Sequence, residues 1–470
     1  MKKKISIYLT LSGLLLFGNG CNDFIDKEPP LYVNEGDVYS NPARIENALS
    51  GLYASMKNAG STYALVGGKG YAAMDARGND IVNVSSNNVE LLDVYNMAVN
   101  DVYADNTHFW TYSYLTINRV NVFLAGIDGA KELLGTSLYN QYRSEALFVR
   151  AMCYYYLNNL YGKPYILDSN AKSVPLRLLP ELTAGNNSMP ASTVAQVYDQ
   201  VLSDLSDANI SALPDTKNDY TTVTRATKAA ANMLKMRVYM SQSKWTEAIS
   251  AGEAITGYAL AADVAATFKP PYFNKESIFS LPMAQNNRPN TQLSLPEFYN
   301  SANDILLVDT EAGILSKANY SLAIDARVKS FVGDNKRLLK YTDVANKLDW
   351  VPVFRYAETL LNLAECYASP GGSNNEAKAK ELLKLVRNRS VDPNQDPLKI
   401  DQLSGSSLIE AISDERRLEL IGEGVRGIDI TRKGETFKKG AGANYFEVKP
   451  TDVGYLWPIP ASEKLSNPGL

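Results

Sequence analysis

The segment TRATKAAANMLKMRVYMSQSKWTEAISAGEAIT, residues 224–256, carries the clearest secondary-structure signal in this chain. It predicts two helices, at about 224–240 and 245–256, because a short turn at 241–243 separates two runs of helical character. Small side chains, which let a neighbouring helix approach closely, occur on the first helix at Ala226, Ala229 and Ala230. A close helix pair of this kind indicates a mainly α fold.

Further helices are expected on both sides of this pair. The first follows Asn41, because Pro42 suits a first helical turn and apolar residues follow at 4-3-4 spacing. The others are expected at about 107–127, 138–161, from a cap at Ser192, and at about 354–368, 374–388 and 407–421. Helix pairs with short turns, and the Trp-x-x-Ala start at 245–248, resemble tetratricopeptide repeats, although no regular period of about 34 residues runs through the chain.

Other parts of the chain lack a helical period. Residues 258–350 contain Pro270-Pro271 and the apolar group Ile278, Phe279 and Leu281, which favour loops and short strands. We therefore predict a single domain over 41–470, preceded by a signal peptide (1–20) and a tether (21–40). Its helical-pair scaffold spans about 41–257 and 351–433, and its irregular inserts span about 60–105, 258–350 and 434–470.

The first residues have the layout of a secretory signal peptide. Three lysines at positions 2–4 precede a 13-residue, mostly apolar run from Ile5 to Phe17, which is too short for a permanent membrane span. Gly18 and Gly20 then lead to Cys21. A cysteine at the cleavage point predicts a bacterial lipoprotein in which Cys21 is acylated, and several acyl chains anchor a protein firmly. The alternative is an unmodified cysteine beside an ordinary cleavage site.

Composition excludes several classes of function. The whole chain has a formal charge of −4, and removing residues 1–20 removes three Lys and no acid, so the mature chain is more acidic still. This gives no electrostatic reason to bind nucleic acid. Cys153 and Cys366 lie in apolar helical contexts and are expected to be buried thiols. With a single histidine and no paired Cys or His spacing, no metal site is expected.

Catalytic motifs are weak. His108 precedes Phe109 and Trp110 at a predicted helix start, where a capping or core role is expected rather than a Ser-His-Asp triad. Gly67-Gly68-Lys69-Gly70 lacks the spacing of a phosphate-binding loop and is interpreted as a flexible turn. The 51 acidic residues make chance carboxylate pairs plentiful, so a glycoside hydrolase stays open as an alternative. No catalytic residue is assigned.

Residues 414–432, DERRLELIGEGVRGIDITR, alternate charges densely. Arg416 can pair with Glu419 at i,i+3 spacing, and Glu423 can pair with Arg426 in the same way if the helix continues through Gly422. We interpret the segment as an ion-pair network that locks the last helix to its neighbours, rather than as an active site.

The same segment is similar to the C-terminal helix motif of the SusD/RagB family. The last residues, YLWPIPASEKLSNPGL (455–470), resemble the ending of that family, and the lipoprotein start CNDFIDKEP (21–29) also matches. Two helices resemble the family framework: EALFVRAMCYYYLNNLYG (145–162) and FRYAETLLNLAE (354–365). The resemblance covers most of the chain except about 60–105 and 258–350.

The resemblance implies a lipoprotein of the outer membrane that faces outward. Family members pair a tetratricopeptide-like helical half with an irregular half, and sit as a lid on a SusC-like TonB-dependent barrel. They deliver oligosaccharides, or in the RagB branch peptides, into that barrel. The resemblance implies binding without catalysis and without a cofactor.

Sugar recognition needs flat aromatic faces together with polar groups for the hydroxyls. The family often places ligand residues in the loop before the second long helix, where the candidates here are Asp75, Arg77, Asn79, Asp80, Tyr95 and Asn96. Asp75 and Asp80 have the alternative role of capping turns or holding an ion. In the irregular half the candidates are Tyr272, Phe273, Asn286, Arg288, Tyr299 and Trp350. Residues 60–109 contain no Trp, which argues against a broad tryptophan platform there.

The sequence therefore predicts a surface lipoprotein that captures oligosaccharides for a partner barrel. The alternatives are a peptide receptor, a secreted glycan hydrolase on a helical scaffold, and a structural lid whose ligand contacts come from the barrel. No residue pattern distinguishes one glycan from another.

Overall fold

The computed structural model describes residues 35–470 except 58–59, 62, 65, 184 and 186, with the side chains of residues 35 and 36 also left out. The predicted signal peptide, Cys21 and most of the predicted tether lie outside these residues. In the part that is described, no helix is both long and apolar enough to cross a membrane.

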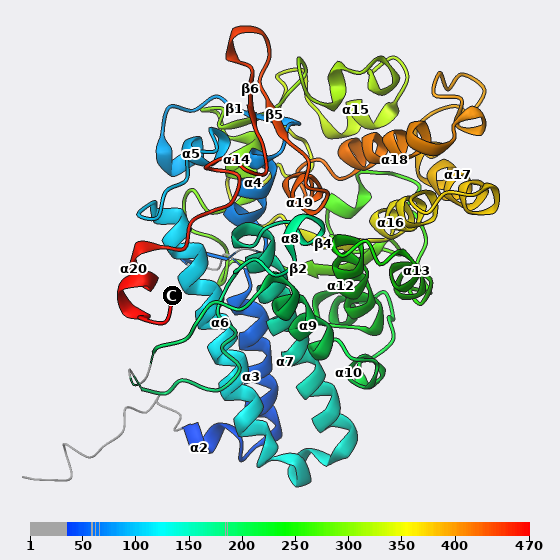
Figure 1. The fold of residues 1–470 in the computed structure, drawn as a ribbon. Helices are drawn as coiled ribbons and strands as arrows, with labels where there is room; N and C mark the ends of the chain where they lie inside the picture. The colour runs from blue at the N-terminus through cyan, green and yellow to red at the C-terminus, as the bar shows by residue number, and fades with distance from the viewer. Residues whose placement is uncertain (1–34, 58–59, 62, 65, 184, 186) are drawn as a thin grey trace, which may run out of the picture.

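Helices dominate the structure (Figure 1). In the first half they are α2 (Glu35–Val38), α3 (Pro42–Ser55), α4 (Gly68–Arg77), α5 (Leu92–Tyr95), α6 (Ala104–Asp128), α7 (Lys131–Tyr161), α8 (Tyr165–Asp168), α9 (Val194–Asp204), α10 (Asp207–Ala212), α11 (Tyr220–Thr224), α12 (Lys228–Ser241) and α13 (Trp245–Glu253). In the second half they are α14 (Leu295–Asn300), α15 (Ala326–Phe331), α16 (Tyr356–Ala368), α17 (Ser373–Arg387), α18 (Gly405–Glu419), α19 (Arg426–Arg432) and α20 (Ala461–Ser466). Short 3₁₀ turns lie at Asn88–Glu90, Ala266–Phe268, Ile314–Ser316, Ala318–Tyr320, Ile400–Gln402 and Gly442–Asn444.

The described strands form three antiparallel two-stranded ribbons. They pair β1 (Ile81–Asn83) with β3 (Leu306–Val308), β2 (Ser277–Leu281) with β4 (Val351–Arg355), and β5 (Phe437–Lys439) with β6 (Phe446–Val448). In β2–β4, Leu281 lies opposite Val351 and Ser277 opposite Arg355. The ribbon β5–β6 projects from one end of the molecule (Figure 1).

The long helices pack in chain order into an array. α6 packs on α7, α7 on α9, α12 on α13, α13 on α16, and α16 on both α17 and α18. Figure 1 shows α3, α6 and α7 side by side at one end, with α16, α17 and α18 on the opposite side of the molecule. The predicted mainly α, tetratricopeptide-like scaffold with irregular inserts is confirmed.

Several sequence predictions need correction in detail. The cap of α9 is Thr193, one residue after Ser192, because its side chain and that of Gln196 form a reciprocal capping box. Residues 67–70 are not a flexible turn: α4 begins at Gly68, and the whole helix is buried. The helix predicted from Thr224 begins at Lys228, because Thr224 is the last residue of α11 and Thr227 caps the start of α12. α20, at 461–466, was not expected.

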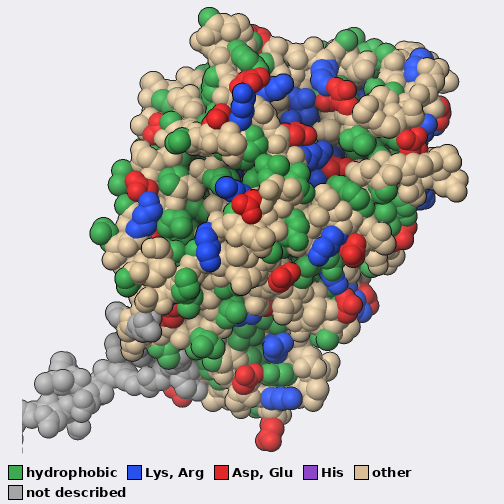
Figure 2. All heavy atoms as spheres, viewed as in Figure 1, with side chains coloured by type: hydrophobic (Ala, Val, Ile, Leu, Met, Phe, Trp, Pro, Cys, Tyr) green, Lys and Arg blue, Asp and Glu red, His purple; other side chains and the backbone are tan. Residues whose placement is uncertain are grey.

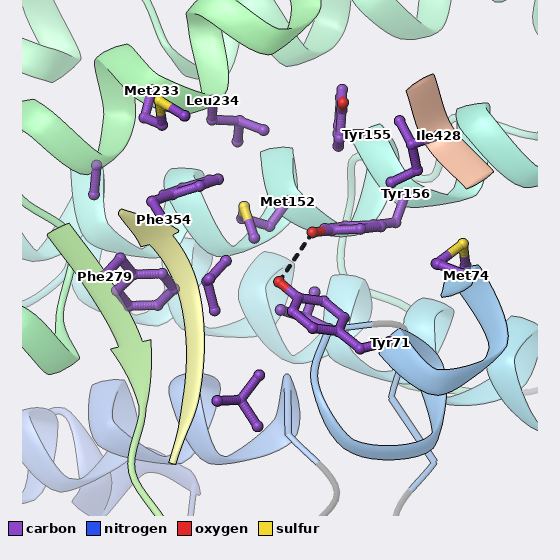
Figure 3. Packing of buried hydrophobic residues seen from close by; sticks show 14 of the residues in the cluster. Tyr71, Met74, Met152, Tyr155, Tyr156, Met233, Leu234, Phe279, Phe354 and Ile428 are labelled. Atoms are coloured by element: carbon purple, nitrogen blue, oxygen red, sulfur yellow. Dashed lines mark hydrogen bonds between the residues drawn. The ribbon is translucent and has the colours of Figure 1, made fainter. Parts of the chain in front are cut away.

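The core lies between the helical array and ribbon β2–β4. In Figure 3, Phe279 of β2 and Phe354 of β4 pack near Met152 and Met233 of the array. Tyr71 of α4 and Tyr156 of α7 are both fully buried, and their hydroxyls hydrogen-bond at 3.1 Å. Such a bond satisfies polar groups that would be costly to bury alone. Cys153 and Cys366 are buried free thiols, as predicted.

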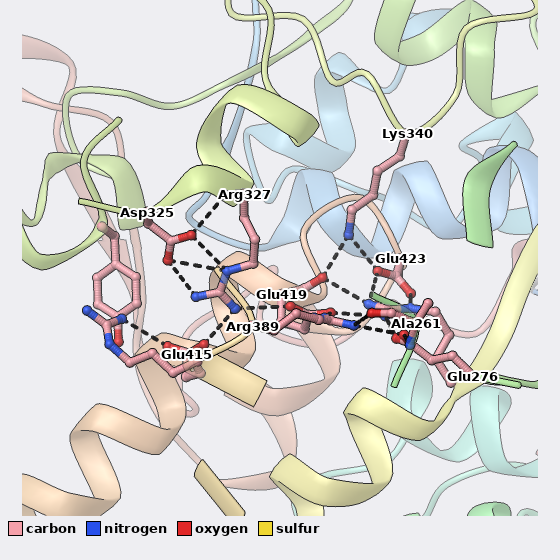
Figure 4. Close-up of polar contacts among 12 residues, drawn as sticks. Ala261, Glu276, Asp325, Arg327, Lys340, Arg389, Glu415, Glu419 and Glu423 are labelled. Atoms are coloured by element: carbon pink, nitrogen blue, oxygen red, sulfur yellow. Dashed lines mark hydrogen bonds and ion pairs between the residues drawn. The ribbon is translucent and has the colours of Figure 1, made fainter. Parts of the chain in front are cut away.

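Buried ion pairs join the array to ribbon β2–β4 (Figure 4). Arg355 of β4 binds Glu423 through Nε at 2.7 Å, and also Glu276 and Glu419. Arg389 bridges Glu276 and Glu419, at 2.8 and 2.6 Å. Two further cations belong to this network: Arg327 pairs with Asp325, Glu415 and Glu419, and Lys340 pairs with Glu423.

The predicted locking network is therefore present, but its pairing was predicted wrongly. α18 ends at Glu419 and Gly422 adopts φ +81°, so the helix does not continue to Glu423 and Arg426. Arg416 and Glu419 both lie within α18, but each binds other partners. Arg416 instead binds Asp429 at 3.1 Å, and Arg426 donates to Asn79 at 2.8 Å. Burial alone raises the pKa of Glu419, but the guanidiniums of its Arg partners outweigh it and hold the pKa well below its ordinary value.

Charges on the molecular surface are mixed. Figure 2 shows acidic and basic side chains interspersed on one face, with hydrophobic groups in small patches. Among the described residues, no group of three or more His, Cys, Asp or Glu is placed to hold a metal ion.

Candidate functional site

Two long loops meet at one end of ribbon β2–β4. Because Leu281 lies opposite Val351, the chain leaves β2 and enters β4 at one end of the ribbon. The loops there are 282–293 and 342–350, and Arg288 of the first donates from Nη1 to the carbonyl of Asn346 in the second, at 3.1 Å. Surface loops on a rigid support are where binding residues are usually found.

A third segment joins these loops. Gly60 makes a parallel bridge with Pro289, and the Asn290 side chain donates to Ser61 Oγ at 2.8 Å. Together the three segments line an open groove of about 630 Å³. Its described lining is mainly polar and basic with one aromatic ring: Ser61, Tyr63, Arg288, Pro289, Asn290, Thr291, Leu293, Ala345 and Lys347.

An aromatic cluster lies beside the groove, at the end of loop 342–350. The Trp350 ring is close to parallel with those of Tyr272 and Phe273, with centroids 5.7 and 6.0 Å away. Tyr220 of α11 meets it edge-on at 5.6 Å and is 55% exposed. The Tyr272 hydroxyl donates to Asp349 at 3.1 Å, and Tyr272 has φ +64°, a conformation uncommon for a bulky residue. We name Tyr220, Tyr272, Phe273 and Trp350 the aromatic platform.

Tyr220 also lines a second cavity, of about 350 Å³, between α3, α11 and the end of β2. Lys57 and Asn287 lie on its wall, and Asn287 is the neighbour of Arg288 in the groove. We name this space the Lys57 cavity. The groove shares loop 282–293 with the Lys57 cavity and loop 342–350 with the platform, and Tyr220 belongs to both the platform and the cavity. We name the groove, the platform and the Lys57 cavity together the strip.

The structure brings five sequence-predicted residues to this strip. Tyr272, Phe273 and Trp350 belong to the platform, Arg288 lines the groove, and Asn286 is exposed on loop 282–293.

The candidates from the first insert lie elsewhere, and most of them hold the fold. Asp75 is buried and accepts from the Tyr299 hydroxyl at 2.7 Å and from the Gly424 amide at 3.1 Å. Burial raises the pKa of Asp75 to about 7. Asp80 is buried against Arg417 and the amide of Ile314. The capping role considered for both carboxylates fits these contacts better than ligand binding.

Arg77, Asn79, Tyr95 and Asn96 are also away from the groove lining. Arg77 is buried, donates to the Tyr455 carbonyl at 2.7 Å and packs on Phe437. Tyr95 packs under the ammonium of Lys439, and Asn96 is exposed. Tyr299, from the second insert, is buried with Asp75. We therefore leave Asp75, Arg77, Asn79, Asp80 and Tyr299 out of the proposed contact set.

Sequence reasoning missed four residues of the strip: Lys57, Tyr63, Tyr220 and Lys347. The Tyr63 ring packs against the His108 ring, with 4.2 Å between centroids and an angle of 35° between the planes, so the histidine supports the groove wall instead of capping α6. The only available signal was that Tyr63 and Tyr220 fall in polar segments, where an aromatic residue has little core to enter.

Comparison with known proteins gives consistent results. A family profile described as "Starch-binding associating with outer membrane" matches residues 23–240, and one described as "SusD family" matches 328–470. A crystal structure of a SusD superfamily protein from Bacteroides fragilis is 55% identical, with a TM-score of 0.89, and covers 92% of this chain and 100% of that one.

Two more distant relatives extend this comparison. "SusD-like protein P25" from Formosa agariphila is 25% identical over 524 residues, covering 96% of this chain and 94% of its own. A solved "Laminarin binding SusD-like protein" shares the fold at 22% identity and a TM-score of 0.70, covering 91% of this chain and 98% of that one. With both halves matched and a relative so similar over nearly its whole length, this chain belongs to the SusD/RagB family.

Proposed function

We propose that this protein is a glycan-binding lipoprotein of the cell surface, which captures oligosaccharides on the strip of groove, platform and Lys57 cavity. The observation that carries the proposal is the aromatic platform, which shares loop 342–350 with the polar groove. Sugar rings offer an apolar face to an aromatic ring and hydroxyl groups to polar side chains, and the strip supplies both.

The platform is supported well enough to present its rings in a fixed way. The Tyr272 hydroxyl is bound to Asp349, whose other oxygen accepts from the amides of Thr342 and Asp343. A pre-arranged surface loses less side-chain entropy when a ligand binds.

The relatives support the proposal. One family profile is described as starch-binding, and one solved relative is named for laminarin binding. Neither name identifies the glycan of this chain. The profile description also mentions association with the outer membrane, which agrees with the predicted acylation of Cys21 and with a SusC-like TonB-dependent barrel as the partner that receives the glycan.

We propose capture without cleavage. The described lining of the groove contains no carboxylate, whereas glycoside hydrolysis ordinarily uses two. A capture site of this kind works at millimolar dissociation constants, about −4 kcal/mol, when a partner pore removes the bound ligand. The proposed function requires no cofactor.

The test is a glycan and peptide array probed with residues 22–470, with bound material analysed for cleavage. Intact binding to glycans is the expected result. Binding to peptides alone would replace the proposal with a peptide receptor, and cleaved glycans would replace it with a hydrolase. An array without any ligand would favour a structural lid whose binding site is completed by the barrel.

A further inference from the structure

Lys57 has unusual surroundings for a lysine. It follows α3, is only 3% exposed, and lies on the wall of the Lys57 cavity. Its ammonium donates to the Pro282 carbonyl and, at 3.1 Å, to the Asn287 side chain. Both acceptors are neutral, and no carboxylate among the described residues lies within ion-pair distance of it.

Other buried lysines of the chain have a clear structural partner. Lys69 binds Asp105 at 2.8 Å and Lys340 binds Glu423 at 2.6 Å. Lys439 bonds the carbonyls of Ala76 and Gly78 at the C-terminus of α4, which is a favourable position for a cation. Lys57 differs from Lys69 and Lys340 because no acid pairs with it, and from Lys439 because it lies on the wall of a cavity large enough for a sugar residue.

Glu46 on the wall of the Lys57 cavity, and Glu145 next to it, are both engaged with another cation, Arg225. Arg225 binds Glu145 through Nε at 2.7 Å and also binds Glu46. Desolvation by burial lowers the pKa of Lys57 to about 8. The ammonium is thus mostly protonated at neutral pH, although it is almost fully buried and has no carboxylate partner among the described residues. A buried charge in this state gains most from an anionic partner.

The rest of the lining suits a sugar. The hydroxyl groups of Ser50, Thr221 and Thr224 and the amide of Asn287 offer hydrogen bonds, and Tyr220 adds an exposed ring shared with the platform. Arg288, the next residue along the loop, also makes no ion pair within the described part of the chain. Two cations without a carboxylate partner therefore lie on either side of Asn287: Lys57 in the cavity, hydrogen-bonded to its side chain, and Arg288 in the groove, next to it in sequence.

We propose that the Lys57 cavity is a subsite for an anionic sugar residue, whose carboxylate or sulfate ester binds the Lys57 ammonium. The inference rests on the proposed function and names the class of glycan: an acidic oligosaccharide, in which the charged residue enters the cavity while its neighbours lie on the platform and in the groove.

The test uses matched pairs of oligosaccharides on residues 22–470. Uronic acid oligomers are compared with their methyl esters, and sulfated oligomers with their desulfated forms, by isothermal titration calorimetry. We expect the wild type to prefer the charged member of one pair by about tenfold or more, the size of one charge-assisted hydrogen bond. A preference for uronic acid oligomers over their methyl esters indicates a carboxylate ligand, and a preference for sulfated over desulfated oligomers indicates a sulfate ester.

Three variants assign the preference to Lys57. Lys57→Met should bind charged and neutral members equally, whereas Lys57→Arg should keep most of the preference. Lys217→Met removes an exposed charge near α11 and should change nothing. Binding of the neutral member reports the fold of each variant, and Lys57→Gln, which retains a donor for Pro282 and Asn287, serves if Lys57→Met fails to fold.

The outcomes separate this inference from the proposed function. If the wild type binds neutral glycans as tightly as charged ones, or if Lys57→Met keeps the preference, the anionic subsite is wrong while glycan capture stands. If neither charged nor neutral glycans bind, glycan capture itself is wrong. If the only ligand found is a peptide, the Lys57 cavity is a site for a peptide carboxylate instead of an anionic sugar.

Discussion

Trp350 connects the platform to the loop that lines the groove. Its ring meets three other aromatic rings and remains partly exposed, so it is both well supported and available. We expect Trp350→Ala to weaken glycan binding about tenfold, because it removes the largest ring of the platform. Calorimetry against the array ligand measures this effect. Tyr445→Ala, an exposed tyrosine before β6, is the matched control, and an equal loss in both variants would contradict the platform.

Asp75 shows what a predicted site residue does when it is buried. Its pKa of about 7 exceeds the ordinary value of 3.8, so the folded chain holds the proton more tightly than the unfolded chain between these limits. Folding stability contributed by this group is therefore present below about pH 4 and is lost as the pH rises toward 7. The Arg-paired acids such as Glu419, whose pKa is lowered, have the opposite sign at lower pH.

Asp75→Asn removes this titration and retains an oxygen for Tyr299 and Gly424. We expect the variant to match the wild type near pH 4 and to be more stable by about 1–3 kcal/mol at pH 8, where the wild type must ionise a buried carboxyl. Urea unfolding at both values measures the difference. A difference that does not change with pH would show that Asp75 is ionised in the folded protein throughout.

At the scale of elements, the two ends of ribbon β2–β4 have different structural roles. At one end, Arg355 and Glu276 belong to the ion-pair network with Glu419 and Glu423. At the other end, Leu281 and Val351 lead into the loops of the groove. The network therefore fixes the ribbon against the helical array, and the ribbon in turn fixes where the binding loops begin.

Arg355→Met tests this arrangement. It leaves three buried carboxylates short of a partner, and we expect it to lower the free energy of unfolding by about 3–5 kcal/mol. Lys378→Met breaks the exposed pair with Glu381 in α17 and should cost less than about 1 kcal/mol. Urea denaturation compares the two variants. A loss below about 1 kcal/mol for Arg355→Met would mean that the ribbon is held mainly by apolar packing.

At the scale of the whole molecule, the helical array acts as a support and the irregular segments carry the strip. The groove is assembled from residues near 61, 290 and 346, which are far apart in the chain. Its position on the cell depends on the lipid anchor predicted at Cys21, outside the described residues. The proposed capture function requires that anchor to keep the protein beside its proposed partner barrel.

We expect Cys21→Ser, expressed as the full precursor in a bacterial host that processes lipoproteins, to leave the membrane fraction, because acylation supplies the membrane affinity. Fractionation followed by immunoblotting measures the shift. The affinity of the Cys21→Ser variant for the array ligand in solution should equal that of the wild type, and this measurement controls for folding. A variant that stays in the membrane fraction would place the anchor elsewhere.

The local pattern of the sequence was sufficient for much of the scaffold. Apolar spacing, Pro42 and the turn at 241–243 predicted α3, α6, α7, α12 and α13 closely, because helix formation is governed by neighbours a few residues apart. The ends of the helices were predicted less accurately. Thr193 rather than Ser192 caps α9, because both residues have a suitable hydroxyl and only the backbone geometry selects one of them.

The sequence by itself determined the helical class, the family resemblance, the buried thiols and a charge-rich locking segment. Only the tertiary structure decided which charges pair, since Arg416 and Glu419 point to partners far along the chain, and which polar residues are buried. It also decided that Lys57, Tyr220 and Arg288 share one strip. Register between distant loops depends on long-range packing, and a local sequence pattern carries no information about that packing.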